Sequence, residues 1–119
     1  MVSPPQTRSA ENLYYDALDL LEQGHPHDAE ALLRRCLVLD PGMVDALHGL
    51  IRALRELGQL DEAIALAHRL IELDPEEPLA HTSLSILYQH KGMIAEAEAE
   101  SVKAKLLGWK RQLREEDQS

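Results

Sequence analysis

The chain has 119 residues, a formal net charge of −9, 45% hydrophobic residues and 28% charged residues, a balance typical of one globular domain. The acidic balance argues against nucleic-acid binding, which needs clustered Lys and Arg, and the single cysteine, Cys36, excludes an internal disulfide. The first ten residues contain no apolar run, so we expect no signal peptide, no membrane span and a cytoplasmic protein.

The predicted elements are all helices, because apolar residues recur at helical spacing and Gly or Pro stands at the breaks. Asp40-Pro41 and Asp74-Pro75 are predicted to cap and start the third and fifth helices, since an Asp oxygen accepts unpaired N–H groups and Pro presets the backbone. A disordered lead-in over 1–8 is followed by helices at about 9–23, 27–39, 41–57, 60–73, 75–91 and 94–115, and by a frayed tail at 117–119.

Three series of residues recur with a spacing of 34 positions. Pro41 and Pro75 share this spacing, and Trp109 occupies the equivalent position of the third copy. An internal period of this size indicates one two-helix unit that is copied and stacked. The three series are Gly24, Gly58 and Gly92; Ala29, Ala63 and Ala97; and Leu39, Leu73 and Leu107.

Each predicted helix has one apolar stripe, and the short connections make neighbouring helices antiparallel. A single pair leaves apolar surface on both sides, so about three stacked pairs are needed for stability. Ala63 is expected where two helices approach most closely, because a larger side chain there would cost about 1–3 kcal/mol of overpacking. Cys36 lies on the apolar side of its helix and is expected to be a buried small hydrophobe.

Seven positions of each copy follow a common pattern, over about residues 10–109. They are Leu13, Asp16, Ala17, Leu20, Ala29, Leu33 and Pro41; Leu47, Leu50, Ile51, Leu54, Ala63, Ala67 and Pro75; and His81, Leu84, Ser85, Tyr88, Ala97, Ser101 and Trp109. This pattern resembles the tetratricopeptide repeat. The resemblance implies an all-α, right-handed α-solenoid of three antiparallel helix hairpins with an extended last helix. Its single domain would span 9–116, with repeats at about 10–43, 44–77 and 78–111. Asp16, Ile51 and the absence of Phe depart from the pattern and predict looser packing.

By resemblance, the first helices of the repeats form a concave groove that binds a segment of another protein. The function predicted in this way is a non-catalytic protein–protein interaction adaptor. The residues expected to line the groove are Tyr14, Leu18, Leu21, His48, Arg52, Arg55, Leu79, Thr82 and Ile86.

Arg52 and Arg55 lie on one face of the third helix inside an otherwise acidic chain. One interpretation is a fork that binds an acidic side chain or a terminal carboxylate of the partner segment. The alternative is that the two arginines pair with nearby carboxylates and contribute little. The candidate carboxylates are Asp19, Glu22 and Glu56.

One subgroup of the family clamps the C-terminal carboxylate of heat-shock chaperones with Lys and Asn. The corresponding positions here are Tyr14, Leu18, Gly49, Leu79 and Ser83. None of these is Lys, Asn or Arg, so we do not expect a chaperone-tail clamp.

We expect a different role for each of the three tyrosines. Tyr14 is expected in the groove, since a tyrosine offers apolar area with a polar tip. Tyr15 could anchor a ligand or lie in solvent, and neither alternative is preferred. Tyr88 matches the family's core tyrosine and is expected to be structural.

The histidines do not predict a metal site, because no spacing typical of zinc ligands accompanies them. His81 occupies an apolar family position and is expected to be a packed core ring. The sequence also lacks a phosphate-binding loop and a nucleophile motif, so we predict no cofactor and no catalysis. Glu96, Glu98 and Glu100 alternate with alanines and are expected on a solvated helix face.

The C-terminus supports an alternative function. Val102, Leu106, Trp109 and Leu113 continue one apolar stripe past the last repeat. Either this extension folds back as a cap, or Trp109 and Leu113 stay exposed and mediate self-association. In the second case the chain would be an assembly protein that associates through the ends of its stack.

Overall fold

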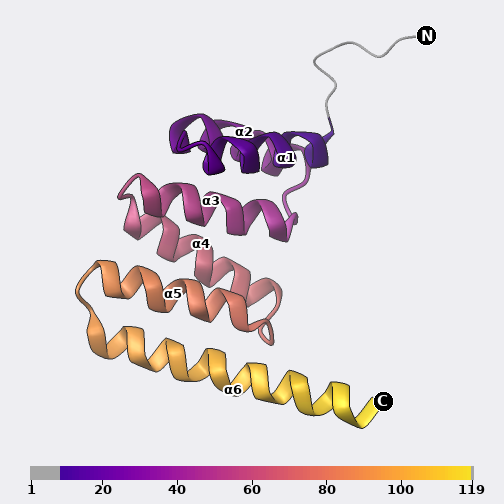
Figure 1. Cartoon of the computed structure of the whole chain (residues 1–119), viewed down its shortest axis with the longest axis vertical. Coiled ribbons are helices and arrows are strands. Elements are labelled where there is room, and N and C mark those ends of the chain that lie inside the picture. Colours follow the sequence, from indigo (N-terminus) through magenta and orange to yellow (C-terminus); the bar gives the residue numbers. More distant parts are fainter. Residues whose placement is uncertain (1–8, 119) are drawn as a thin grey trace. The chain divides into compact units, whose positions relative to one another are not determined.

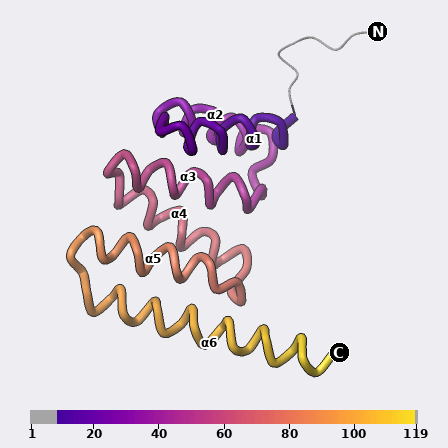
Figure 2. Tube along the Cα trace, viewed as in Figure 1, coloured from indigo at the N-terminus to yellow at the C-terminus, as the bar shows by residue number. Residues whose placement is uncertain are grey.

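The computed structural model describes residues 9–118, and every regular element in this range is an α-helix. The all-α prediction is therefore confirmed for this part of the chain. Figures 1 and 2 follow the helices in order along the chain. They are α1 (Ala10–Glu22), α2 (Pro26–Leu39), α3 (Val44–Glu56), α4 (Leu60–Leu73), α5 (Pro78–His90) and α6 (Ile94–Gln118).

The chain divides into two compact units, Met1–Gln59 and Leu60–Ser119. Unit 1 contains α1, α2 and α3, and unit 2 contains α4, α5 and α6. The division lies inside the second predicted repeat, 44–77. A single domain over 9–116 stays a prediction, and the lead-in over 1–8 lies outside the described residues, as does Ser119 at the end of the predicted tail.

In unit 1, α2 contacts both α1 and α3, and α1 contacts α3. Cys36 is fully buried, as expected, and its thiol donates to the Ala10 carbonyl oxygen at 3.3 Å. Burial raises the pKa of this thiol, because the charged thiolate is poorly solvated away from water. The buried residues on α1 and α2 are Leu13, Ala17, Leu21, Ala29, Leu33 and Cys36.

In unit 2, α5 contacts both α4 and α6. Ala63 and Ala97 are buried like Ala29 of unit 1, which confirms that the three alanines occupy equivalent positions. The Ser85 hydroxyl on α5 donates to the Ala97 carbonyl of α6 at 2.8 Å. An ion pair between Lys91 and Asp61 joins the end of α5 to α4.

The three turn glycines have equivalent geometry. Gly24, Gly58 and Gly92 have φ angles of 82°, 78° and 76°, the left-handed region that favours glycine. After each glycine, the next backbone N–H donates at 2.8 Å to a carbonyl five positions earlier. This pattern satisfies carbonyls that the helix end leaves unpaired. The predicted 34-residue register is therefore confirmed at all three turns.

The predicted starts of the third and fifth helices were wrong. Both Asp-Pro pairs lie in turns, and α3 and α5 begin three positions after each proline, at Val44 and Pro78. The Asp74 carboxylate accepts from the Glu76 N–H at 3.3 Å, within the turn. The cap of α5 is Glu77, whose side chain accepts from the Leu79 N–H at 3.0 Å. At the other end, α6 continues to Gln118, beyond the expected end near Glu115.

One substitution at two glycines should have opposite effects. Gly58→Ala should lower the free energy of unfolding by about 1–2 kcal/mol, because alanine resists a positive φ. Gly108→Ala should raise it by up to about 1 kcal/mol, since Gly108 is inside α6 and an added Cβ would meet no atom within 4 Å. Urea unfolding of both variants measures this, and a loss at Gly108 equal to that at Gly58 would contradict it.

Candidate protein-binding surfaces

In unit 1, the contacting helices α1 and α3 carry a set of partly exposed residues that we call the α1–α3 face. The face consists of the half-buried residues Tyr14 and Leu18 on α1 and His48, Arg52 and Arg55 on α3. The pKa of Tyr14 is raised by partial burial, then by the negative charge of Asp45, and last by Tyr15. The two helices α1 and α3 contact each other. The face therefore continues from one helix to the other.

Leu21 was expected in the groove but is only 3% exposed. It belongs to the core of unit 1 and offers almost no surface to a ligand. The apolar part of the α1–α3 face is therefore made by Tyr14 and Leu18.

Arg52 forms one of the alternative ion pairs expected from the sequence. Its Nε donates to Glu56 Oε1 at 3.4 Å, one helical turn later. Both side chains are partly exposed, so this pair contributes little to stability. Arg55 forms no ion pair within residues 9–118. The fork stays a prediction, and the cation available without rearrangement is Arg55.

Tyr15 lies at the edge of this face and is 54% exposed. Its ring centroid lies 5.6 Å from that of Tyr14, with the two planes inclined at 52°. Its hydroxyl donates to Glu11 Oε1 at 3.4 Å. The two rings form one aromatic pair, of which Tyr14 is the inner member.

In unit 2, the predicted groove residues lie on α5 and form a less polar surface. Leu79 is exposed and Ile86 is half-buried. The Thr82 hydroxyl donates to the Pro78 carbonyl at 3.3 Å, within the same helix. This part of the predicted groove offers apolar contacts and carries no cation among the three predicted positions.

Gly49 cannot act as a clamp position without rearrangement. It is buried on α3, where an added Cβ would lie 3.0 Å from Leu33 Cδ2 of α2. Any side chain at this position would have to displace Leu33 rather than enter the α1–α3 face. That the chain is not a chaperone-tail clamp stays a prediction, and this packing favours it.

His81 and Glu100 form a buried pair that the sequence interpretation missed. Each residue is 8% exposed, and His81 Nδ1 donates to Glu100 Oε2 at 2.6 Å. Lys103 donates to the other carboxylate oxygen at 3.3 Å. Burial alone would raise the pKa of Glu100, but the hydrogen bonds from His81 and Lys103 lower it overall.

The assignment of Glu100 to a solvated face was therefore wrong, whereas Glu96 and Glu98 are exposed as expected. The buried His81 ring agrees with the expected core position. A signal was present in the sequence, because Glu100 follows Ala97 by three positions and so lies on the inward side of the last helix.

Removing the buried carboxylate should destabilise the chain. Glu100→Leu should lower the free energy of unfolding by about 1–3 kcal/mol at pH 7, since His81 would lose its partner inside the protein. The pKa of Glu100 is lower in the folded protein than its ordinary value of 4.5. Its contribution to the free energy of unfolding is therefore fully present above pH 4.5 and is lost as the pH falls through the lowered pKa. The difference between wild type and variant should therefore shrink below pH 4.5.

Urea unfolding from pH 7 down to pH 3 measures this difference. Glu98→Leu is the matched control, because Glu98 is exposed on the same helix and should change stability by no more than about 0.5 kcal/mol. Equal effects of the two substitutions would mean that the buried pair has no special role.

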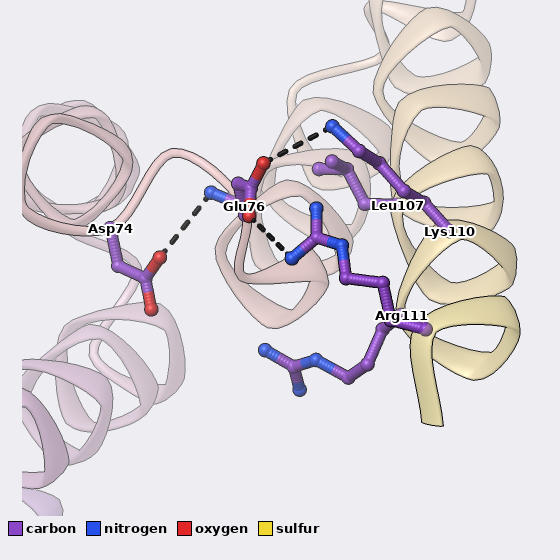
Figure 3. A pocket seen from close by; sticks show the side chains of 6 residues that line it. Asp74, Glu76, Leu107, Lys110 and Arg111 are labelled. Carbon is purple, nitrogen blue, oxygen red and sulfur yellow. Dashed lines mark hydrogen bonds and ion pairs between the residues drawn. The ribbon is translucent and has the colours of Figure 1, made fainter. Parts of the chain in front are cut away.

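A second charged cluster joins α6 to the turn between α4 and α5 (Figure 3). Glu76 accepts from Lys110 at 3.1 Å and from Arg114 at 2.8 Å, and Glu77 accepts from Arg111 at 3.0 Å. The bonds from Arg114 and Lys110 lower the pKa of the exposed Glu76 carboxyl to about 2. The cluster borders a polar cleft of about 110 Å³ lined by Asp74, Glu76, Leu107, Lys110, Arg111 and Arg114.

The cluster predicts a specific titration result. Arg114→Gln should raise the pKa of Glu76 from about 2 toward its ordinary value of 4.5, because the strongest partner of the carboxylate is removed. Carbon-13 NMR of the glutamate side-chain carboxyls measures this shift. Arg69→Gln on α4 is the control and should leave the Glu76 pKa unchanged. An unchanged pKa in the Arg114 variant would mean that the ion pair does not persist in solution.

The continuation of α6 exposes both residues that we expected to mediate self-association. Trp109 is 61% exposed and Leu113 is 62% exposed. They lie on the same continuous helix that contacts α5. No separate capping helix follows within the described residues. Self-association stays a prediction.

The described residues 9–118 contain neither a membrane-spanning helix nor a cluster of metal-ligating side chains. No helix there is both long enough and apolar enough to cross a membrane. Within the same range, no group of three or more His, Cys, Asp or Glu side chains is placed to hold a metal ion.

The two-helix period, the equivalent turns and the equivalent buried alanines define a helical-repeat protein. The sequence profile of the tetratricopeptide repeat matches residues 20–87, which is more than half of the chain. The chain belongs to the tetratricopeptide repeat family. The fold class and family expected from the sequence are confirmed. No curated protein matches the sequence.

Solved structures agree with this assignment. The Yersinia enterocolitica type III secretion chaperone SycD, in complex with a peptide of the translocator YopD, is 29% identical with a TM-score of 0.76, over 82% of this chain and 74% of that chain. MamA is 26% identical with a TM-score of 0.80, over 87% and 61%. YrrB, a tetratricopeptide protein with an unusual peptide-binding site, is 22% identical with a TM-score of 0.80, over 86% and 53%.

Proposed function

We propose that this chain is a non-catalytic protein-interaction module that binds a peptide segment of another protein on the first helices of its repeats. The observation that supports the proposal is that α1 contacts α3 and that Tyr14 and Leu18 on α1 and Arg52 and Arg55 on α3 are all only half-buried. Such a surface supplies apolar contact area and charged donors side by side, as peptide-binding surfaces do. The complex of SycD with a YopD peptide supports this class of ligand.

The charges of the α1–α3 face favour an acidic segment or a terminal carboxylate. Arg52 and Arg55 carry planar guanidinium groups, which bind carboxylates through paired hydrogen bonds. The Arg52–Glu56 bond uses Nε, so the two terminal nitrogens of that guanidinium remain for a ligand. The chain as a whole carries a net charge of −9, so it repels acidic ligands over most of its surface. A local cationic surface therefore determines where an acidic ligand binds.

The non-catalytic part of the proposal agrees with the environment of Cys36. Cys36 is the one cysteine of the chain, and its thiol is buried and bonded to a carbonyl oxygen. Burial raises its pKa, which is opposite to the shift that activates a catalytic thiol. The α1–α3 face itself presents Tyr, Leu, His and Arg side chains suited to binding.

A random library of 12-residue peptides displayed on phage, selected on the immobilised protein, tests the proposal. We expect enrichment of sequences with Asp or Glu beside apolar residues. In Arg52→Ala plus Arg55→Ala, the affinity of a selected peptide should fall by about tenfold or more, since a hydrogen bond to a charged group contributes about 1.5–3 kcal/mol. Isothermal titration calorimetry measures the affinity.

The matched control is Arg34→Ala plus Arg35→Ala, which removes the same charge from exposed positions of α2. This control should bind selected peptides like the wild type. If both double variants weaken binding equally, the effect comes from net charge and the fork is excluded. If the wild type enriches no peptide, the proposal of a peptide-binding module fails.

A further inference from the structure

The outward stripe of α6 consists of Val102, Leu106, Trp109 and Leu113. These side chains are 53%, 55%, 61% and 62% exposed. Their spacings of four, three and four positions place them along one line of the helix. The side of α6 that faces α5 is a different one, marked by the buried Ala97 and Glu100. The helix is therefore apolar on a side that its own unit leaves open.

The repeat register shows that this side is not where another repeat would pack. The positions equivalent to Leu106 are Val38 in α2 and Glu72 in α4, and both are exposed. By contrast, Leu37 in α2 and Ile71 in α4 are half-buried, and their equivalent in α6 is the exposed Lys105. The last repeat thus carries a charge where inner repeats carry an apolar side chain, as expected for the end of an array.

The outward stripe is flanked by cations. Residues 102–114 contain no acidic side chain, in a chain whose net charge is −9. Lys105 makes no ion pair with any residue in 9–118. The other cations reach Glu76, Glu77 and Glu100, so four cations share three carboxylates. The five cations of the segment are Lys103, Lys105, Lys110, Arg111 and Arg114.

We propose that the outward stripe of α6 docks an amphipathic helix of another protein, in which acidic residues flank the apolar positions. An apolar stripe on one helix is normally buried against a similar stripe on another, and the flanking charges select the partner. Here Lys103, Lys105 and Lys110 occupy the flanking positions, so a partner with Glu or Asp beside its stripe is complementary. The site lies on α6 in unit 2, whereas the α1–α3 face lies in unit 1, and both favour ligands with acidic residues beside apolar ones.

A second copy of the chain fits this surface less well. Two parallel α6 helices would place Lys105 beside Lys110 of the other copy, and two antiparallel ones would place Lys103 beside Lys110. An anionic membrane is also less favourable, because its extended surface would approach the acidic residues of the chain as well as these cations, in a chain whose net charge is −9. Charge complementarity therefore favours an acidic helix.

Trp109 is the only tryptophan of the chain and lies within the stripe, so its fluorescence reports occupancy directly. The probe is a synthetic 21-residue helical peptide without tryptophan, with Leu at the first and fourth positions of each heptad and Glu at the flanking positions. A second peptide has Lys in place of Glu. Saturable binding of the Glu peptide should shift the Trp109 emission to shorter wavelength, and the Lys peptide should bind at least about tenfold more weakly.

Variants locate the binding. Leu106→Glu should weaken the Glu peptide by at least about tenfold, because it places a charge in the stripe. Val38→Glu is the matched control, since Val38 occupies the equivalent exposed position of α2, and it should bind like the wild type. Circular dichroism checks that each variant remains helical.

Four results would each overturn the proposal. They are the absence of any shift with the Glu peptide, equal binding of the Glu and Lys peptides, an emission shift that depends on protein concentration alone, and a shift produced by phosphatidylserine vesicles without peptide. The third result would assign the stripe to a second copy, which sedimentation at several concentrations would also detect, and the fourth would assign it to a membrane.

Discussion

The structure depends on one backbone hydrogen bond, which ends the first helix of each repeat (α1, α3 and α5) at a turn glycine. In all three copies the residue after the glycine donates to a carbonyl five positions earlier, at the same length of 2.8 Å. This bond ends one helix and directs the chain into the next, so the apolar stripes meet at the same positions in each copy. As a result, the equivalent alanines at 29, 63 and 97 are all buried.

The two interaction surfaces follow from departures from the repeat rather than from the repeat itself. The α1–α3 face owes its charge to the half-buried Arg52 and Arg55 of α3, which lie outside the seven positions of the repeat pattern. The outward stripe of α6 exists because no Asp-Pro pair ends the last helix, which therefore continues through Trp109. Regular positions maintain the fold, and the variable ones determine which ligands can bind.

The sequence was sufficient for features that depend on neighbouring residues. The extent of α4 and the continuation of α6 past the last repeat both reflect local patterns. Features that depend on a distant partner were missed. Glu100 was placed in solvent because its neighbours alternate with alanine, whereas its burial depends on His81, on another helix.

The predicted starts of α3 and α5 were wrong for a different reason. An Asp-Pro pair is compatible with a helix start and with a turn, and only the following residues distinguish the two. The groove could be predicted as a set of positions but not as a surface. Leu21 and Gly49 show why, because both are buried and the 34-residue pattern alone does not identify which positions are buried. The choice of Glu56 among three possible partners of Arg52 likewise needed the side-chain positions.

The ion pairs Lys110–Glu76 and Arg111–Glu77 each join residues that are 34 positions apart, which means that equivalent slots of successive copies touch one another in unit 2. The later copy has cations where the earlier one has anions. If a gene duplication replaced the last copy with a second version of residues 44–77, glutamate would face glutamate at both slots. Two successive copies of residues 44–77 would therefore repel each other at these positions, and the present pair of copies avoids this by carrying opposite charges.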